Sequence, residues 1–237
     1  MNPFRIKPIF STALALTLFL TIHAQTAQEI VAKHIEALGG KAKLQSINSV
    51  FIEGVAVTSN GTSSDTKLWK VYDRLYRQEV SYGTGSVITI VTPNRGWICS
   101  GQGSSEFKSL PSAQLRALQP EIDPAGPLAD YDAKGCKVDL DGKDTVNGAP
   151  CYRIRLSCPM GQSVVYSIDM KSYYILRETR RGGALSIDFS DYKTTPEGYI
   201  FPFTIVTDAT GGKINVERVE VNHNVDVDTL GKPRKAA

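Results

Sequence analysis

The cysteines are the residues of this sequence with the most definite chemistry, and two of the four are predicted to face each other. With residues 146–148 as the centre of a turn, the flanking strands pair in a register that sets Cys136 opposite Cys158. In an oxidising compartment this pair can form a disulfide; the alternative is two buried free thiols, because cross-strand disulfide geometry is demanding. Cys99 and Cys151 stay unassigned, and no C-x-x-C spacing indicates a zinc site.

Histidines and nucleophiles give little support to catalysis. His34 is expected to be a packed or half-exposed helix residue, and His223 stands near Asp226 and Asp228 in a segment more typical of solvated chain than of a metal site. No G-x-S-x-G, H-E-x-x-H or P-loop pattern occurs, and no nucleophile can be matched with a base. The sequence therefore predicts neither an enzyme nor a bound cofactor or metal.

Aromatic and leucine residues are instead candidates for the wall of an apolar ligand cavity, with an ordinary sheet core as the alternative. The stretch "YIFPFTIV" (199–206) is apolar on both faces, whereas an antiparallel sheet in water normally keeps one face polar. Two covered faces with few helices leave room for a ligand on one of them. The predicted cavity residues are Trp69, Tyr76, Trp97, Leu115, Leu118, Tyr166, Phe189 and Phe203.

The N-terminus predicts export. Arg5 and Lys7 precede an apolar run that ends near the small residue Ala24, which is typical of a cleaved secretory signal peptide over residues 1–24; an uncleaved anchor is the alternative. No cysteine lies near the cleavage position, so lipid attachment is not expected. The predicted location is the periplasm.

The remaining residues, 25–237, are long enough for one domain with a single core. Without Arg5 and Lys7, 25 of the 27 basic residues remain against 24 acidic residues. The net charge of residues 25–237 is therefore about +1. The basic tail "KPRK" is expected to be solvated, so nothing indicates a nucleic-acid partner.

Hydrophobic periodicity places these residues on a mainly β scaffold. A capping box at Thr26 and Glu29 predicts a first helix that ends at Gly39-Gly40, and alternation from Val50 onward predicts about ten antiparallel strands. Two leucine-bearing helical segments, 109–120 and 123–132, interrupt the strands. The last strand changes parity, which predicts a bulge near Glu217-Arg218.

This order of elements resembles the LolA-like superfamily of periplasmic lipoprotein carriers, including outer-membrane-lipoprotein-sorting homologues. The resemblance is carried by "HIEALGGKAKL", "PLADYDAKG", "VNGAPCYRIRL", "VYSIDMKSYYILRE", "DFSDYKTTPEGYIFPFTI" and "VEVNHNVDVDTLGKP". It implies an α+β, strongly curved antiparallel half-barrel, with the N-terminal helix and a central helical lid over the concave face. One departure concerns the arginine that ties the lid shut in such carriers: its position falls at about Tyr72, with Arg74 nearby.

The function implied is that of a cell-envelope binding protein that holds a lipid or the acyl chains of a lipoprotein in an apolar cavity. Its expected partners are a lipid or an acylated protein, together with envelope transport proteins for handover. The alternative is a non-enzymatic sensor or protein-interaction module on the same half-barrel. We expect residues 109–132 and the first helix to cover the concave face beside Trp69, Trp97 and Phe203.

Overall fold

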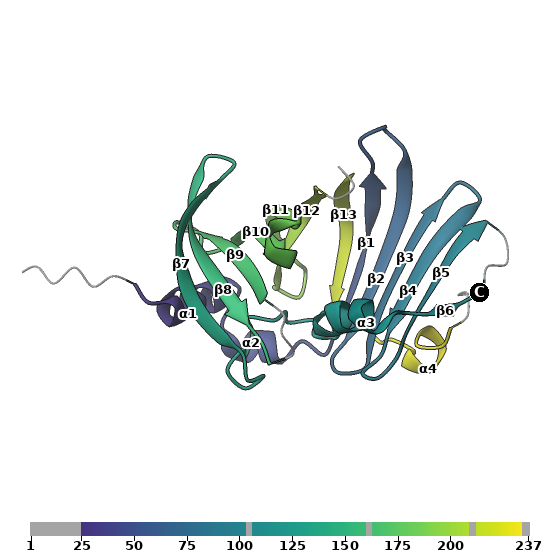
Figure 1. The fold of residues 1–237 in the computed structure, drawn as a ribbon, viewed down its shortest axis with the longest axis horizontal. Coiled ribbons are helices and arrows are strands. Elements are labelled where there is room, and N and C mark those ends of the chain that lie inside the picture. Colours follow the sequence, from purple (N-terminus) through teal and green to yellow (C-terminus); the bar gives the residue numbers. More distant parts are fainter. Residues whose placement is uncertain (1–24, 103–105, 160–162, 209–211, 234–237) are drawn as a thin grey trace, which may run out of the picture.

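The computed structural model of the chain describes residues 25–102, 106–159, 163–208 and 212–233 (Figure 1). The predicted signal peptide lies outside this range. The described chain forms one open antiparallel sheet with few helices, which confirms the mainly β prediction. The sheet curves so that strands β7–β9 and strands β1–β6 lie on opposite sides of helix α3 (Figure 1).

Thirteen strands make up the sheet in the described residues, rather than about ten, and they follow the order β6-β5-β4-β3-β2-β1-β13-β12-β11-β10-β9-β8-β7. One of them, β6, has only two residues. The strands are β1 (Ser49–Val57), β2 (Ser63–Val71), β3 (Leu75–Tyr82), β4 (Gly85–Val91), β5 (Gly96–Gln102), β6 (Lys108–Ser109), β7 (Lys137–Val146), β8 (Ala149–Ser157), β9 (Ser163–Asp169), β10 (Ile175–Arg180), β11 (Leu185–Thr194), β12 (Ile200–Thr207) and β13 (Gly212–Val221).

Short helices lie on both faces of the sheet. They are α1 (Ala27–Ala37), α2 (Lys41–Gln45), α3 (Ser112–Leu118), the 3-10 helix η1 (Gln119–Ile122), the 3-10 turn η2 (Arg181–Gly183) and α4 (Val227–Leu230). The predicted capping box is present at the start of α1, where Thr26 and Glu29 exchange side chain–backbone hydrogen bonds.

The hairpin of β7 and β8 has the predicted register at the cysteines, but for a different reason. Its turn is a two-residue Asn147-Gly148 connection with both residues at positive φ, the pair that such turns favour. That turn shifts the first pairs by one residue, and a bulge between Leu140 and Lys143 restores the predicted register. Cys136 and Cys158 form the predicted disulfide.

A second bulge also falls where the sequence predicts it. Arg218 pairs with Glu53 and Val216 with Gly54, so Glu217 is the extra residue of β13. At this point the backbones come so close that a Cβ on Gly54 would lie 2.3 Å from the carbonyl oxygen of Asn215. Only glycine fits opposite this bulge without displacing the neighbouring strand.

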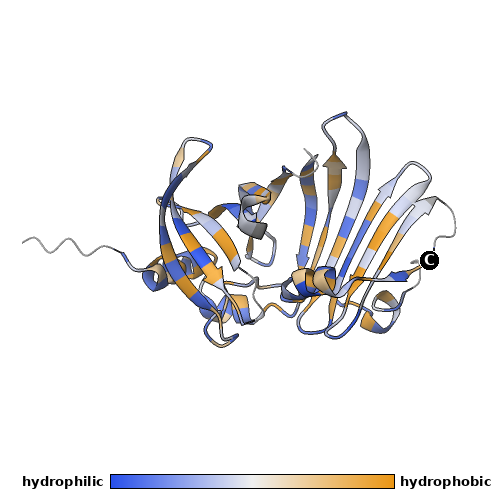
Figure 2. Cartoon of the chain, in the orientation of Figure 1, coloured by the Kyte–Doolittle hydropathy of each residue, from blue (hydrophilic) through white to orange (hydrophobic). Residues whose placement is uncertain are grey.

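Alternation along the strands gives the sheet two apolar faces, and orange bands of apolar residues interrupt the blue ones along most strands (Figure 2). The inner face carries the side chains packed under α1, α2, α3 and η1, in three buried clusters. The outer face carries Leu75, Ile88, Ile90 and Cys99, which pack with Leu230 of α4. Both faces of the β3–β5 region are therefore covered.

The central segment, residues 110–135, connects β6 with β7. Its first half is helical as predicted, in α3 and η1. The predicted helix over 123–132 is wrong: these residues form consecutive turns. Gly126 takes a φ of +85°, and Pro127 has no N–H to donate, so a helix cannot pass through this pair. Asp123 accepts a hydrogen bond from the Ala125 N–H in a turn.

Among the described residues, no helix is long and apolar enough to cross a bilayer.

Candidate ligand-binding site

A cavity of about 1000 Å³ lies between the inner face of the sheet and the central segment, partly open to solvent. Its lining is mainly apolar and comes from three regions: the β2–β5 end of the sheet, the central segment, and the β8–β11 end. Its apolar and aromatic lining residues include Tyr72, Ile98, Leu110, Leu118, Ile122, Leu156, Val164, Tyr166 and Leu185. The volume is at the upper end of the range for small-molecule pockets.

Six of the eight predicted cavity residues lie on the inner face. Leu118 and Tyr166 line the large cavity. Tyr76 and Leu115 belong to the adjacent apolar cluster, in which Tyr76 is buried and Leu115 is partly buried. Phe189 and Phe203 share the inner face with them, because Phe189 pairs with Ile205 and both Phe203 and Ile205 pack on the cluster beneath α2. Those two phenylalanines are not part of the cavity wall.

Trp69 and Trp97 lie on the outer face, so the expectation that the central segment lies beside them requires correction. Trp69 pairs with Arg77, which donates a hydrogen bond to the Leu230 carbonyl oxygen of α4. Trp97 packs with the cluster beneath the same helix. Adjacent residues of a strand point to opposite faces, so the neighbours Lys70 and Ile98 are the ones turned inward.

Glu121 of η1 is the main polar attachment of the central segment to the sheet. Its Oε2 lies 2.6 Å from Lys70 Nζ on β2, and its Oε1 lies 2.7 Å from an Arg180 Nη on β10. Four strands separate β2 from β10 in the sheet. Arg180 also pairs with Glu178. The ionic cluster of Lys70, Glu121, Glu178 and Arg180 therefore links strands β2 and β10 through the central segment.

The electrostatics of this ionic cluster follow from burial and neighbouring charge. Burial opposes ionisation of Glu121, but the positive charges of Lys70 and Arg180 outweigh it and lower its pKa from 4.5 to about 2. For Glu178 burial prevails over the charge of Arg180, and its pKa is raised. Burial also raises the pKa of the Tyr76 and Tyr166 hydroxyls, which are therefore neutral at pH 7.

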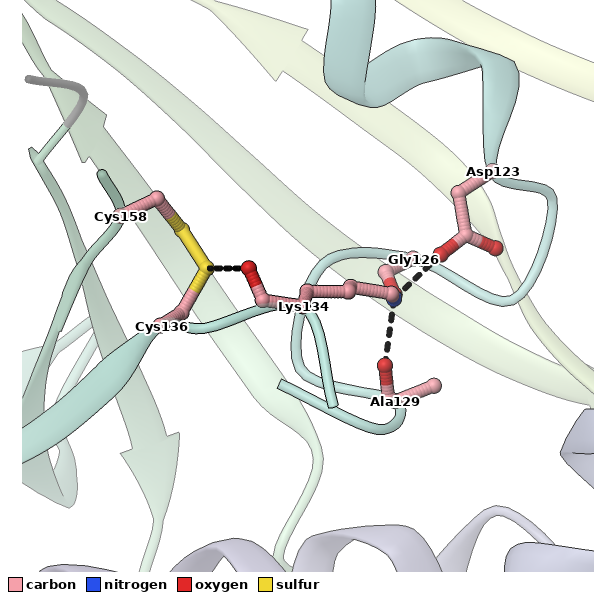
Figure 3. Close-up of a disulfide and its surroundings, with 6 residues drawn as sticks. All are labelled: Asp123, Gly126, Ala129, Lys134, Cys136 and Cys158. Atoms are coloured by element: carbon pink, nitrogen blue, oxygen red, sulfur yellow. Dashed lines mark hydrogen bonds and ion pairs between the residues drawn. A yellow bond between two sulfur atoms is a disulfide. The ribbon is translucent and has the colours of Figure 1, made fainter. Parts of the chain in front are cut away.

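The second half of the central segment is held by Lys134 and by the disulfide (Figure 3). The Lys134 ammonium group pairs with Asp123 and donates to the Ala129 carbonyl oxygen and, at 3.0 Å, to that of Gly126. The carbonyl oxygen of Lys134 lies 3.9 Å from the sulfur of Cys136. Lys134 and both disulfide cysteines border the large cavity.

A smaller cavity of about 150 Å³ lies among α1, α2, the turns of the central segment and strands β10–β12. Its wall, like that of the large cavity, is mainly apolar, and it is partly open to solvent. Its one titratable imidazole is that of His34, which is 4% exposed and has Nδ1 2.8 Å from the Tyr173 carbonyl oxygen. Burial lowers the pKa of His34, despite that hydrogen bond, so the ring is neutral at pH 7.

Sequence reasoning missed Lys70, Glu121 and Arg180. These residues lie 51 and 59 positions apart, so no local spacing connects them. One weak indication of the ionic cluster was present in the sequence. Lys70 shares a strand face with the apolar Leu68, and a charge on an apolar strand face needs a partner.

The histidines hold no metal site in the part of the chain that the structure describes, where no three metal-ligating side chains gather. His223 Nδ1 lies 2.7 Å from a Glu220 carboxylate oxygen. Asp226 instead caps α4 by accepting a hydrogen bond from the Thr229 N–H. The packed-residue interpretation of His34 is confirmed by its burial.

Comparison with known proteins relates this chain to others by fold alone. No protein-family model matches the sequence, and no curated protein matches it. A DUF1329 family protein from Desulfovibrio piger matches in structure with a TM-score of 0.58 and 9% identity, over 88% of this chain and 98% of the other. A LolA superfamily protein from Nitrosomonas europaea matches with a TM-score of 0.56 and 12% identity, over 88% and 99%. The chain thus has the fold of LolA superfamily proteins, as its sequence resemblance implied.

Proposed function

We propose that this protein is a cell-envelope carrier that holds the acyl chains of a lipid or of a lipoprotein. The observation that carries the proposal is the mainly apolar cavity of about 1000 Å³ between the sheet and the central segment. A cavity of this size and composition suits a large apolar ligand. The fold shared with a LolA superfamily protein supports the same class of function.

The proposed mechanism is reversible burial beneath the central segment, which acts as a lid. Each methylene group transferred from water into the cavity contributes about 0.8 kcal/mol. The polar contacts of the lid are those of Glu121 with β2 and β10, and of the Gln119 side-chain amide with the carbonyl oxygens of Thr92 and Pro93. Water can replace these contacts when the lid moves, so the apolar cost of opening is set by the buried Leu110, Ile122 and Leu128.

We propose a binding role rather than a catalytic one, because most charged side chains at the cavity are paired with one another. Lys70 and Arg180 pair with Glu121, and Lys134 pairs with Asp123. The proposed location is the periplasm, where a lipid or acylated protein and an envelope transport protein would be the partners. The Cys136–Cys158 disulfide supports an oxidising compartment.

The proposal is tested in two measurements. Mass spectrometry of the protein isolated under non-denaturing conditions from its own cell envelope should identify bound acyl lipid or acylated peptide. Purified protein stripped of lipid should then take up the apolar fluorophore N-phenyl-1-naphthylamine saturably. Leu118→Asp, which places a charge in the cavity wall, should abolish that uptake.

Leu140→Asp is the matched control, because Leu140 is 42% exposed on edge strand β7 and lies outside the cavity wall. It should bind the fluorophore as wild type does. Absence of saturable uptake by wild type would contradict the carrier function. Recovery of a protein partner on a lipid-free cavity would instead favour the interaction module.

A further inference from the structure

The large cavity and the small one meet at a shared wall. Two residues border both of them: Tyr166 of β9 and Pro127 of the central segment. Tyr166 points to the inner face, since it pairs with Glu178 beside the ionic cluster, and it is only 2% exposed. A ligand in the large cavity is therefore separated from the small one by one aromatic ring and one turn.

The small cavity, here called the tail pocket, suits an apolar group. Residues from α1, α2 and strand β12 line it, among them Ile35, Leu44, Ile47 and Phe201. A mainly apolar cavity of about 150 Å³ has room for a molecule of about the size of benzene. The tail pocket therefore matches the last few carbons of an alkyl chain.

Tyr166 differs from the other tyrosines that line the tail pocket in having no hydrogen bond. Its hydroxyl is fully buried and has no partner among the described residues. By contrast, the Tyr192 hydroxyl donates to the Ile175 carbonyl oxygen at 2.7 Å, and the Tyr199 hydroxyl lies 2.8 Å from the Ser46 hydroxyl. Buried tyrosines normally find a partner, and among these three tyrosines Tyr166 is the one whose ring can rotate without breaking a hydrogen bond.

We propose that the tail pocket is a second subsite for the ligand: Tyr166 rotates, and the methyl end of a long alkyl chain passes from the large cavity into the tail pocket. This inference rests on the proposed carrier function and adds a chain-length preference to it. Chains too short to reach Tyr166 occupy only the large cavity. Each methylene that longer chains place in the tail pocket should strengthen binding about four-fold, which corresponds to about 0.8 kcal/mol.

The experiment fills each cavity separately. Ala125 lines only the tail pocket and Ala117 lines only the large cavity, and both are partly buried alanines of the central segment. Saturated fatty acids of about ten to about twenty carbons compete against N-phenyl-1-naphthylamine on wild type, Ala125→Leu and Ala117→Leu. Thermal unfolding of each variant checks that it is folded; Ala125→Val is the smaller replacement if Ala125→Leu does not fold.

Ala125→Leu should weaken binding of the longest acids by about four-fold for each methylene displaced, and leave the shortest acids unchanged. Ala117→Leu should weaken all lengths alike. The subsite would be refuted if Ala125→Leu keeps the wild-type length profile or lowers every affinity equally. That result differs from failure of the carrier function, in which wild type takes up no fluorophore at all.

Discussion

The two faces of the sheet are both apolar and both covered, yet they are closed in different ways. On the outer face Leu75 and Ile90 have no exposed surface and pack directly under Leu230 of α4. On the inner face the central segment leaves a cavity of about 1000 Å³ beneath it and is held by an ionic cluster and by a few buried apolar side chains, Leu110, Ile122 and Leu128. The outer face is therefore covered by closely packed side chains, whereas part of the inner face borders a cavity.

The difference indicates where the molecule can change shape. Removing a cover that is packed against a close-fitting core exposes apolar surface and costs the full transfer free energy. Removing a cover that is attached by ion pairs over a cavity exposes less new apolar surface, because the cavity wall had no protein atoms against it. The inner cover is therefore the one suited to open and close, and the outer cover is suited to hold the sheet rigid.

The largest expected effect distinguishes the two faces by leucine truncation. Leu75→Ala on the outer face should lower the free energy of unfolding by about 4 kcal/mol, since it empties a fully buried site. Leu118→Ala on the inner face should cost less than about 2 kcal/mol, because that side chain is only partly buried beside a cavity.

Urea denaturation measures the free energy of unfolding of both variants, and fluorophore titration measures their ligand binding. Leu75→Ala should retain wild-type uptake of N-phenyl-1-naphthylamine, whereas Leu118→Ala should weaken it. Equal losses of stability at the two positions would show that the inner cover is packed as closely as the outer one.

Strand alternation predicted which residues share a face but not which face encloses the cavity. Trp69 and Lys70 are neighbours on β2 and point to opposite faces of the sheet. The prediction of Trp69 as a cavity residue therefore placed the cavity on the wrong face of this strand. Size and aromaticity favoured the tryptophans, but large rings also fill cores. The inward charge on Lys70 was the better indicator, because it needs a partner that spacing alone could not identify.

Turn chemistry was more predictable than the covering segment. Asn147-Gly148 indicated a turn at the right place, although its centre was predicted as residues 146–148. The bulge between Leu140 and Lys143, which restores the register that brings Cys136 and Cys158 together, was not predicted. The central segment has no such constraint of its own: after η1 its path depends on Lys134, the disulfide and the sheet. Tertiary contacts of this kind are not encoded in a local pattern.

The next effect concerns the disulfide, which joins the start of β7 to the end of β8 beside the large cavity. Replacing both Cys136 and Cys158 by Ser should lower the free energy of unfolding by about 3 kcal/mol, given a sequence separation of 22 residues. Hydrogen exchange should quicken in residues 130–138, where the central segment enters the sheet, and stay unchanged in β3 and β4.

Cys151→Ala is the control, because Cys151 is a buried free thiol that points to the opposite face of β8. It should leave exchange in residues 130–138 as in wild type. Faster exchange throughout β3 and β4 in the double Ser variant would show that the two faces unfold together and would remove the distinction between them.

A smaller effect follows from Glu121. Its folded pKa of about 2 lies below its ordinary 4.5, so the unfolded chain binds more protons between these values and stability falls as the pH falls. The displacement sets an upper limit of about 3 kcal/mol, and partial exposure reduces the expected contribution to about 2 kcal/mol. This stability is complete above about pH 5.5 and lost near pH 2.

The pH dependence of wild type alone does not give this contribution, because Glu178 in the same ionic cluster has a raised pKa and changes stability with pH in the opposite direction. The comparison of wild type with Glu121→Gln addresses the contribution of Glu121. Lys70, Arg180 and Tyr76 are unchanged in the variant. The difference between wild type and variant, measured by urea denaturation at several pH values, should be about 2 kcal/mol at pH 7 and vanish near pH 2. A difference that does not change with pH would place the effect of Glu121 in packing rather than in charge.

The smallest effect compares two tyrosines that line the tail pocket, Tyr166 and Tyr192. Tyr166→Phe removes a hydroxyl that has no partner among the described residues, so the free energy of unfolding should stay the same or rise by up to about 1 kcal/mol. Tyr192→Phe removes the donor of the Ile175 carbonyl oxygen and should lower it by about 1 kcal/mol. Urea denaturation of the lipid-free variants measures both. A loss for Tyr166→Phe as large as that for Tyr192→Phe would mean that the Tyr166 hydroxyl is anchored in solution, and that its ring is a fixed wall between the two cavities instead of a movable one.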